Sequence, residues 1–86
     1  MRYEVPASVL RARLDDEEVL LNTDTGRYHL LNATGTIVLG VLERGDPLGT
    51  AVIELIQRTD VDEDTARRDA DAFVAALLDR GLLLAV

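Results

Sequence analysis

Few side chains in this 86-residue chain have the chemistry needed for catalysis or metal binding. His29 is the only histidine, and there is no cysteine. A single imidazole with no Cys and no nearby Ser and Asp arrangement provides neither a zinc site nor a catalytic triad. The absence of Cys also excludes disulfides, thiolate metal sites and a Cys nucleophile. We therefore expect a protein that is not an enzyme and that uses no cofactor and no metal.

One acidic motif has the opening spacing of a calcium-binding loop, because Asp60, Asp62 and Asp64 alternate along the chain. Such a loop needs Gly at its sharp turn, where Thr65 stands, and a bidentate Glu further on, where Asp71 stands. Capping of a helix by Asp62 is therefore the better interpretation.

The charge of the chain argues against a polyanionic partner. Sixteen acidic and nine basic residues give a net charge of −7, and every basic residue is Arg. The only adjacent pair, Arg67-Arg68, has acidic residues within helical reach, so we expect no nucleic acid partner. A neutral or basic peptide is compatible with this charge. No window approaches the ~18 apolar residues of a membrane span, and we expect a cytoplasmic protein with no membrane association.

The elements that position any site follow from the apolar spacing. With 48% apolar residues, the chain is long enough for one domain over residues 1–86 with one aliphatic core. Its first third predicts strands at residues 9–14, 18–22 and 27–31. Turns at residues 15–17 and 23–26, the second with an Asp side chain and a Gly able to take positive φ, join them into an antiparallel meander.

After Asn32 the apolar period changes from two to about 3.6 residues, which indicates three helices. The expected N-caps are Asn32, Asp46 (with Pro47 at the first helical position) and Asp62, and the expected helix ends are Gly45 and Gly81. The stripes expected to face the core are Ile37, Val38, Val41 and Leu42, then Leu48, Ala51, Val52, Leu55 and Ile56, and finally Ala66, Ala70, Phe73, Val74, Leu77 and Leu78. Three strands followed by three helices make an α+β fold. Residues 82–86 are a helix extension, a short strand or an apolar tail.

The third strand comes last in the meander and therefore lies at its edge, beside the helices. An edge strand has unpaired N–H and C=O groups, to which an extended peptide can add as another strand. Tyr28 is either a cross-strand packing residue or a groove contact, and Phe73 is expected in the core. We expect a monomer. A dimer through this strand is the alternative, because the same edge can pair with a copy of itself.

A set of residues spread over most of the chain matches a known family. They are Gly26, Tyr28, Leu31 and Asn32 in a Gly-x-Tyr-x-x-Leu-Asn run, then Gly35, Asp69, Phe73 and Leu77, and finally Arg80-Gly81-Leu82. In this order they resemble the PqqD-like proteins, small winged-helix-like domains also called RiPP recognition elements. The stretch "VLLNTDTGRYHLLNATG" is most similar to the free-standing members that serve lasso peptide biosynthesis.

The resemblance implies a non-catalytic adaptor that binds the leader segment of a ribosomally synthesised precursor peptide. The leader would pair antiparallel with the third strand and lie in a groove whose other wall is the third helix. The implied strand wall consists of Arg27, Tyr28, His29, Leu30 and Leu31, and the implied helical wall comes from Arg67, Ala70, Asp71, Val74 and Leu78. The adaptor would present the precursor to a leader peptidase and a cyclase.

Two alternatives remain open. One is a chaperone that serves the precursor of pyrroloquinoline quinone and its radical enzyme, like the protein that gives the family its name. The other is a winged-helix regulator that binds DNA, because strand and helix combinations of this size often do so. A DNA reader needs a basic recognition face, whereas the predicted third helix carries Arg67, Arg68 and Arg80 against five acidic residues.

Overall fold

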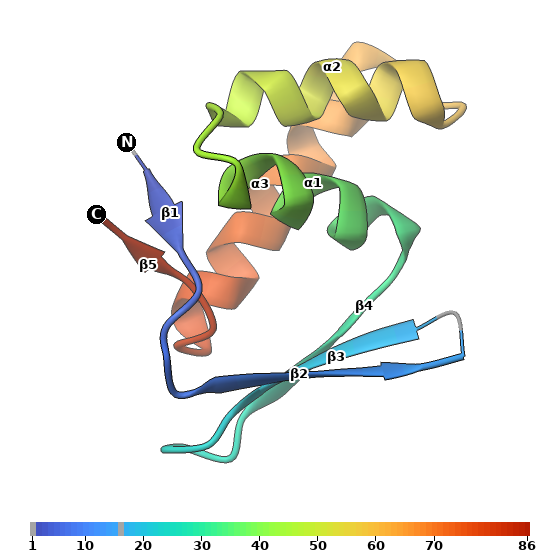
Figure 1. The fold of residues 1–86 in the computed structure, drawn as a ribbon. Coiled ribbons are helices and arrows are strands. Elements are labelled where there is room, and N and C mark those ends of the chain that lie inside the picture. Colours follow the sequence, from blue (N-terminus) through green and yellow to red (C-terminus); the bar gives the residue numbers. More distant parts are fainter. Residues whose placement is uncertain (1, 16) are drawn as a thin grey trace.

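The three-stranded sheet follows the predicted order. The computed structural model describes residues 2–15 and 17–86 (Figure 1). Strands β2 (Val9–Leu14), β3 (Glu17–Asn22) and β4 (Tyr28–Leu31) pair antiparallel in the order β2-β3-β4. The predicted meander is confirmed, and β4 lies at its edge. Asp16, which belongs to the first predicted turn, lies outside the described residues.

Buried Asn22 organises the turn between β3 and β4. Its side-chain oxygen accepts from the N–H groups of Asp24 at 2.9 Å and Thr25 at 3.3 Å. Its side-chain nitrogen donates to the carbonyl oxygen of Gly81 at 2.8 Å. Gly26 completes the turn with a φ of 75°, which a residue without a Cβ adopts without strain. The turn that leads into β4 is thereby attached to the segment after the last helix.

Three helices follow the sheet, namely α1 (Ala33–Glu43), α2 (Leu48–Arg58) and α3 (Glu63–Asp79). Two predicted caps are confirmed, since Asn32 accepts from the Gly35 N–H at 2.8 Å and Asp62 accepts from the Thr65 N–H at 2.7 Å. The N–H groups of the first helical turn lack intrahelical partners, and these side chains satisfy one of them in each helix. The α+β order of three strands and three helices is confirmed.

The start of α2 differs from the prediction. Pro47 is the residue before the helix, not its first residue, and no side chain caps this end. Asp46 instead accepts from the Arg44 Nε at 3.2 Å, so it joins the end of α1 rather than the start of α2. Gly45 ends α1 as predicted, with a φ of 85°.

The core lies between the helices and the inner face of the sheet. Its fully buried large residues are Leu20, Val38, Leu39, Val41, Leu42, Leu55, Leu77, Leu82 and Leu83. Two residues predicted to face this core, Ile56 and Leu78, are each 39% exposed. Both predictions are wrong because each residue lies at the margin of its helix's apolar stripe, where the neighbouring elements no longer cover it.

The ends of the chain form a second, two-stranded sheet. β1 (Tyr3–Glu4) pairs antiparallel with β5 (Leu84–Ala85). The N–H of Val86 also donates to the carbonyl oxygen of Arg2 at 2.8 Å. A short strand is therefore the correct one of the three alternatives for residues 82–86. Its partner at the N-terminus had no periodic signal, because it is only two residues long.

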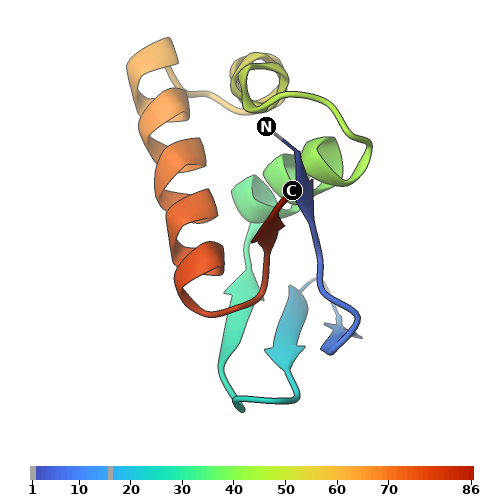
Figure 2. The same cartoon turned by 90° about the vertical axis from the view of Figure 1, so that its left-hand side faces the viewer.

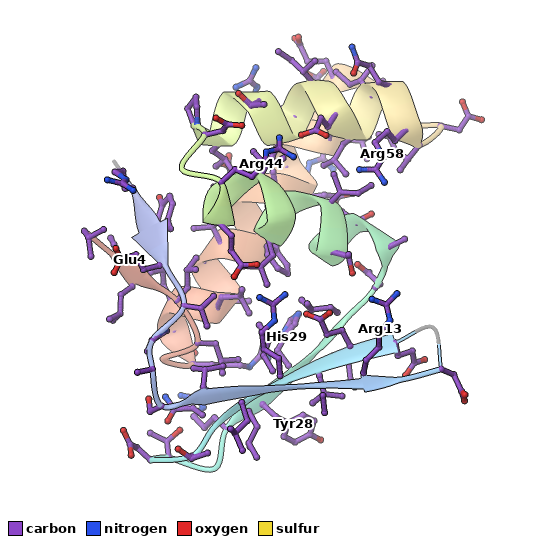
Figure 3. The ribbon with its side chains drawn as sticks, in the orientation of Figure 1. Glu4, Arg13, Tyr28, His29, Arg44 and Arg58 are labelled. Atoms are coloured by element: carbon purple, nitrogen blue, oxygen red, sulfur yellow. The ribbon has the colours of Figure 1, made fainter. Side chains whose placement is uncertain are left out.

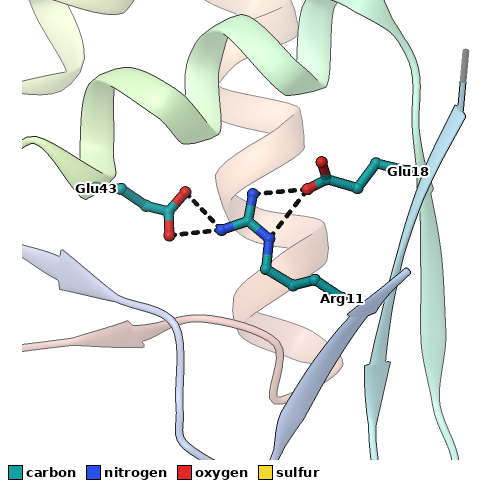
Figure 4. Close-up of polar contacts among 3 residues, drawn as sticks. All are labelled: Arg11, Glu18 and Glu43. Atoms are coloured by element: carbon teal, nitrogen blue, oxygen red, sulfur yellow. Dashed lines mark hydrogen bonds and ion pairs between the residues drawn. The ribbon is translucent and has the colours of Figure 1, made fainter. Parts of the chain in front are cut away.

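An ion-pair network joins the three-stranded sheet to α1 (Figure 4). Arg11 in β2 donates through Nη1 to the two carboxylate oxygens of Glu43 in α1, at 2.8 and 2.7 Å. Its Nε and Nη2 donate to Oε1 of Glu18 in β3, at 3.0 and 2.6 Å. Partial burial opposes the charge of Arg11, but the hydrogen bonds to both carboxylates outweigh it and raise the pKa of Arg11. One guanidinium thereby links three elements.

The helices lie on one side of the three-stranded sheet (Figures 1 and 2). The opposite face of that sheet has no described helix or strand over it. No helix within residues 2–15 and 17–86 is long and apolar enough to cross a membrane.

Candidate peptide-binding groove

Strand β4 has one free backbone edge. The carbonyl oxygen of Arg27, just before β4, accepts a hydrogen bond of 2.8 Å from β3. Hydrogen-bonded pairs recur at every second residue of an antiparallel ladder, so the backbone groups of Arg27, His29 and Leu31 point toward β3. Those of Tyr28 and Leu30 point away from the sheet, on the side where no described strand pairs with β4.

The side chains of this segment alternate between two faces. Arg27, His29 and Leu31 point toward the helices, whereas Tyr28 and Leu30 point away from them, as Figure 3 shows for His29 and Tyr28. Tyr28 is 61% exposed and Leu30 is 55% exposed. The side chain of Tyr28 therefore lies on the face of the sheet away from the helices, where its cross-strand neighbour is Leu21.

His29 lies where β4 approaches the C-terminal half of α3. Its ring meets the Phe73 ring edge-on, with centroids 5.8 Å apart and an interplanar angle of 78°. Its Nδ1 lies 2.6 Å from Nη1 of Arg80. Arg donates but cannot accept, so Nδ1 carries a lone pair and the imidazole is neutral. Desolvation first, and the Arg80 charge second, lower the pKa of His29 below its usual value.

A second polar contact links the start of β4 to the end of α3. Arg27 donates through Nη1 to the carbonyl oxygen of Asp79 and through Nη2 to its Oδ2, both at 3.3 Å. This pair is exposed on both sides and contributes little to stability. It does place a cation beside the start of β4.

Two depressions lie along this edge, and we call them together the groove. One, of about 560 Å³, is lined by Gly26, Arg27, Tyr28, His29, Leu30 and Arg80. The other, of about 340 Å³, is lined by His29, Asn32, Thr34, Gly35, Asp69, Ala72, Phe73 and Ala76. Because His29 lines both, the groove runs along β4 and then between α1 and α3.

The residues predicted for the helical wall do not line these two depressions. Ala70 is fully buried and Val74 is 6% exposed, so both belong to the core and not to the wall. At 100° per residue, Arg67, Asp71 and Leu78 lie on the flank of α3 opposite to the one that faces β4. None of these five residues lines the groove.

The flank of α3 that does line the groove carries Asp69, Ala72, Phe73, Ala76 and Arg80. Asp69, Phe73 and Arg80 match the family pattern, but the site prediction did not include them. The signal for the missing wall was the pair of small residues one turn apart, Ala72 and Ala76. Small side chains at that spacing leave room for another chain beside a helix.

Phe73 has two roles in this arrangement. As predicted, it is in the core, with 9% exposure. Its remaining surface also lines the groove and supports the His29 ring. Among the described residues, no group of three His, Asp or Glu side chains is arranged to hold a metal ion.

The sequence of this groove-bearing domain matches a family model for coenzyme PQQ synthesis protein D (PqqD) over residues 17–83. The chain belongs to the PqqD family. The matched residues include β3, β4 and all three helices, so every wall of the groove lies within the PqqD match. No curated protein gives a significant match.

Two solved structures agree with this PqqD-type chain over nearly its whole length. The structure described as TbiB1 in complex with the TbiA(beta) leader peptide has 34% identity and a TM-score of 0.82, and covers 100% of this chain and 98% of its own. The structure described as lasso peptide synthetase B1 complexed with the leader peptide has 26% identity and a TM-score of 0.89, and covers 99% of this chain and 100% of its own. The resemblance to a PqqD-like domain of the lasso type is confirmed.

Proposed function

We propose that this chain binds the leader segment of a precursor peptide by strand addition to β4, and that it acts in lasso peptide biosynthesis. The observation that carries the proposal is the free backbone edge of β4 beside the groove. Both whole-chain structural neighbours are described in complex with a leader peptide. They favour the lasso type over the chaperone for the pyrroloquinoline quinone precursor.

The alternation along β4 determines how an added strand would lie. The N–H and C=O groups of Tyr28 and Leu30 point outward and would form the ladder with the leader. In such a ladder, the leader residue opposite His29 points to the helical side of the sheet and enters the groove. Its two neighbours, opposite Tyr28 and Leu30, point to the other face.

The binding energy would come chiefly from side chains in the groove. Each strand hydrogen bond contributes only about 0.5–1.5 kcal/mol net, so the ladder mainly sets register and direction. Apolar area buried against Ala72, Phe73 and Ala76 contributes about 25 cal/mol per Å² before ordering costs are subtracted. One or two inserted apolar side chains then suffice for micromolar to nanomolar binding.

The role that we assign is binding and presentation, without catalysis by this chain. The one imidazole of the groove is neutral and accepts from Arg80, an arrangement that suits a fixed wall. The chemistry would be performed by partner enzymes, a leader peptidase and then a cyclase, to which the bound precursor is presented.

An amide NMR titration tests the binding step. The probe is a synthetic leader from the precursor encoded beside this protein, and a scrambled leader is the control. We expect saturable shifts at residues 26–32 and on the Asp69, Ala72 and Ala76 flank of α3, with none for the scrambled peptide. Shifts confined to the Arg67 and Asp71 flank, or no shifts at high micromolar leader, would contradict the proposal.

A further inference from the structure

The two ends of the groove carry opposite charges. Arg80, at the C-terminal end of α3, lines the depression beside the start of β4. Asp69, near the middle of α3, is exposed and lines the depression between α3 and the start of α1. The flank of α3 between these two residues is apolar and consists of Ala72, Phe73 and Ala76. Along α3, the groove therefore leads from a cation over an apolar middle to a carboxylate.

Neither of these two charges is neutralised within the described part of the chain. The half-buried Arg80 donates to the neutral imidazole of His29, and no described carboxylate forms an ion pair with it. Asp69 likewise has no arginine partner among residues 2–15 and 17–86. Arg27, the other cation of the groove, is already paired with Asp79. Because a guanidinium has several N–H donors, Arg80 can still receive a carboxylate from a ligand.

The alternation of a strand determines which leader residues meet these charges. In an antiparallel leader, the N-terminal side lies toward Leu31 and α1, and the C-terminal side lies toward Arg27. We call the leader residue opposite His29 the central leader residue. The other leader residues on the helical side of the sheet are two positions before it, opposite Leu31, and two positions after it, opposite Arg27.

The spacing of the two charges matches this set of leader residues. Asp69 and Arg80 lie eleven positions apart, so their backbones are about 16 Å apart at about 1.5 Å per helical residue. The two outer leader residues are about 13 Å apart at about 3.3 Å per strand residue. The long side chains of Lys, Arg and Glu cover the remaining distance. The earlier of the two faces the Asp69 end of the groove, and the later faces the Arg80 end.

We propose that the groove selects leaders by the order of their charges, with a basic residue two positions before the central leader residue and an acidic residue two positions after it. This inference rests on the proposed function, because it assumes strand addition to β4. The basic side chain pairs with Asp69 and the acidic side chain pairs with Arg80. The opposite order would place like charges together at both ends, which disfavours the wrong peptide and the wrong strand direction.

The test compares two versions of one leader that differ only in charge order. The probe is the synthetic leader from the precursor encoded beside this protein, with Lys before and Glu after the central leader residue, or with the two exchanged. NOE contacts with the Phe73 ring identify the central leader residue in the wild-type complex. Because both versions have the same composition, the net charge of −7 acts equally on them. Fluorescence anisotropy with the full chain measures both affinities.

We expect the version with Lys before and Glu after to bind about tenfold more tightly than the exchanged version, since two attractive pairs replace two repulsive ones. Arg80→Gln combined with Asp69→Asn should abolish this preference. Asp69→Arg combined with Arg80→Glu should reverse it, which a merely structural role of these residues would not do. Arg67→Gln and Asp71→Asn make the same neutral changes on the opposite flank of α3 and should leave the preference within about twofold.

Equal affinities of the two versions for the wild type, or a preference for the exchanged version, would overturn the inference and leave the proposed function intact. A preference that survives Arg80→Gln with Asp69→Asn, or that disappears in Arg67→Gln or Asp71→Asn, would also overturn it. A natural leader that does not bind, or that makes no contact with the Phe73 ring, would overturn both. Thermal melts identify any variant that does not fold, and the comparison on the wild-type protein needs no variant.

Discussion

At the scale of single residues, the groove is organised around His29. Its ring is supported by Phe73 and its Nδ1 is occupied by Arg80. The neutral imidazole is therefore fixed in one tautomer and one orientation, with its Nε2 carrying the proton. A wall that is already ordered lowers the entropic cost of binding an extended peptide.

This arrangement predicts a depressed pKa for His29. An NMR titration of its ring signals should give a pKa below the usual value of about 6.5, because desolvation and the Arg80 charge both disfavour the imidazolium. Arg80→Gln should raise that pKa, since it removes the charge. Arg58→Gln, at an exposed position on α2, is the control and should leave it unchanged.

The sign of the linked stability follows. The unfolded chain takes up the proton at about pH 6.5, while folded His29 resists it to a lower pH. The contribution of neutral His29 to the free energy of unfolding is therefore fully present above about pH 6.5 and is lost as the pH drops below that value. Urea midpoints that fall less between pH 7 and pH 5 in His29→Gln than in the wild type would agree, and equal falls would refute this assignment.

Gly35 predicts a second residue-scale effect. A Cβ at this position would lie 2.8 Å from Cε1 of Phe73 and 3.2 Å from Cδ2 of Leu31. Gly35→Ala should therefore cost about 1–3 kcal/mol of unfolding free energy by overpacking. Gly40→Ala, in the same helix with nothing within 4 Å of the added Cβ, should instead stabilise by up to about 1 kcal/mol. Urea denaturation of both variants makes the comparison, and equal effects would contradict it.

At the scale of elements, the groove depends on β4 and one flank of α3. Local patterns were enough to predict the strands of the three-stranded sheet, the helices and the caps at Asn32 and Asp62, because alternation, helical period and capping chemistry all act within a few residues. The predicted cap at Asp46 is wrong, because Pro47 is itself the residue before α2 and no side chain caps this end of the helix.

The helical wall could not be predicted in the same way. An apolar stripe says which face of α3 is buried, but both of its flanks are polar and look equivalent in sequence. Which flank turns to β4 depends on tertiary contacts such as Arg27 with Asp79 and His29 with Arg80, which join residues about fifty positions apart. Prediction from sequence therefore chose the Arg67 and Asp71 flank.

Two matched alanines distinguish the groove flank from the solvent face of α3. Ala72 and Ala75 are both exposed, but only Ala72 lines the groove. Ala72→Arg should weaken leader binding by about tenfold or more by filling the space that the leader would occupy. Ala75→Arg should leave it within about twofold. Isothermal titration with the same leader measures both, and a reversed order would place the groove elsewhere.

The free edge of β4 predicts a period of two in the leader backbone. Within β4, the residues with outward backbone groups are Tyr28 and Leu30. Within the paired leader segment, N-methylation should therefore weaken binding at every second residue, by about two- to tenfold for each lost hydrogen bond. Intervening positions, whose N–H groups point away from β4, should tolerate the methyl group. Equal losses at successive positions would argue against strand addition.

At the scale of the whole molecule, two sets of side-chain hydrogen bonds join the three-stranded sheet to the rest of the fold. The Arg11 network joins β2 and β3 to α1, and Asn22 joins the turn before β4 to Gly81. The two-stranded sheet of β1 and β5, which we call the ribbon, is a third connection and joins the two ends of the chain. The position of β4 relative to α3 thus depends on contacts distributed over the fold.

The ribbon predicts a stability effect at a distance from the groove. Deletion of residues 84–86 should lower the free energy of unfolding by about 1–3 kcal/mol, because the backbone hydrogen bonds to β1 and to Arg2 are lost. Leu84→Thr alters a half-exposed side chain but keeps the backbone pairing. It should change the free energy of unfolding by no more than about 0.5 kcal/mol. Thermal and urea unfolding measure both. A deletion without effect would mean that the ribbon is only marginally formed.

The alternation along β4 also affects how binding specificity can change by mutation. Under the proposed function, Tyr28 and Leu30 hold the leader with backbone groups that every amino acid except Pro supplies, while their side chains point to the face of the sheet away from the helices. His29 instead has its side chain in the groove and its backbone groups toward β3. Mutations at His29 can thus change which precursor the domain binds, while mutations at Tyr28 and Leu30 change the exposed face of the sheet and keep the backbone ladder. Libraries that randomise only odd or only even residues of this strand would separate the two effects.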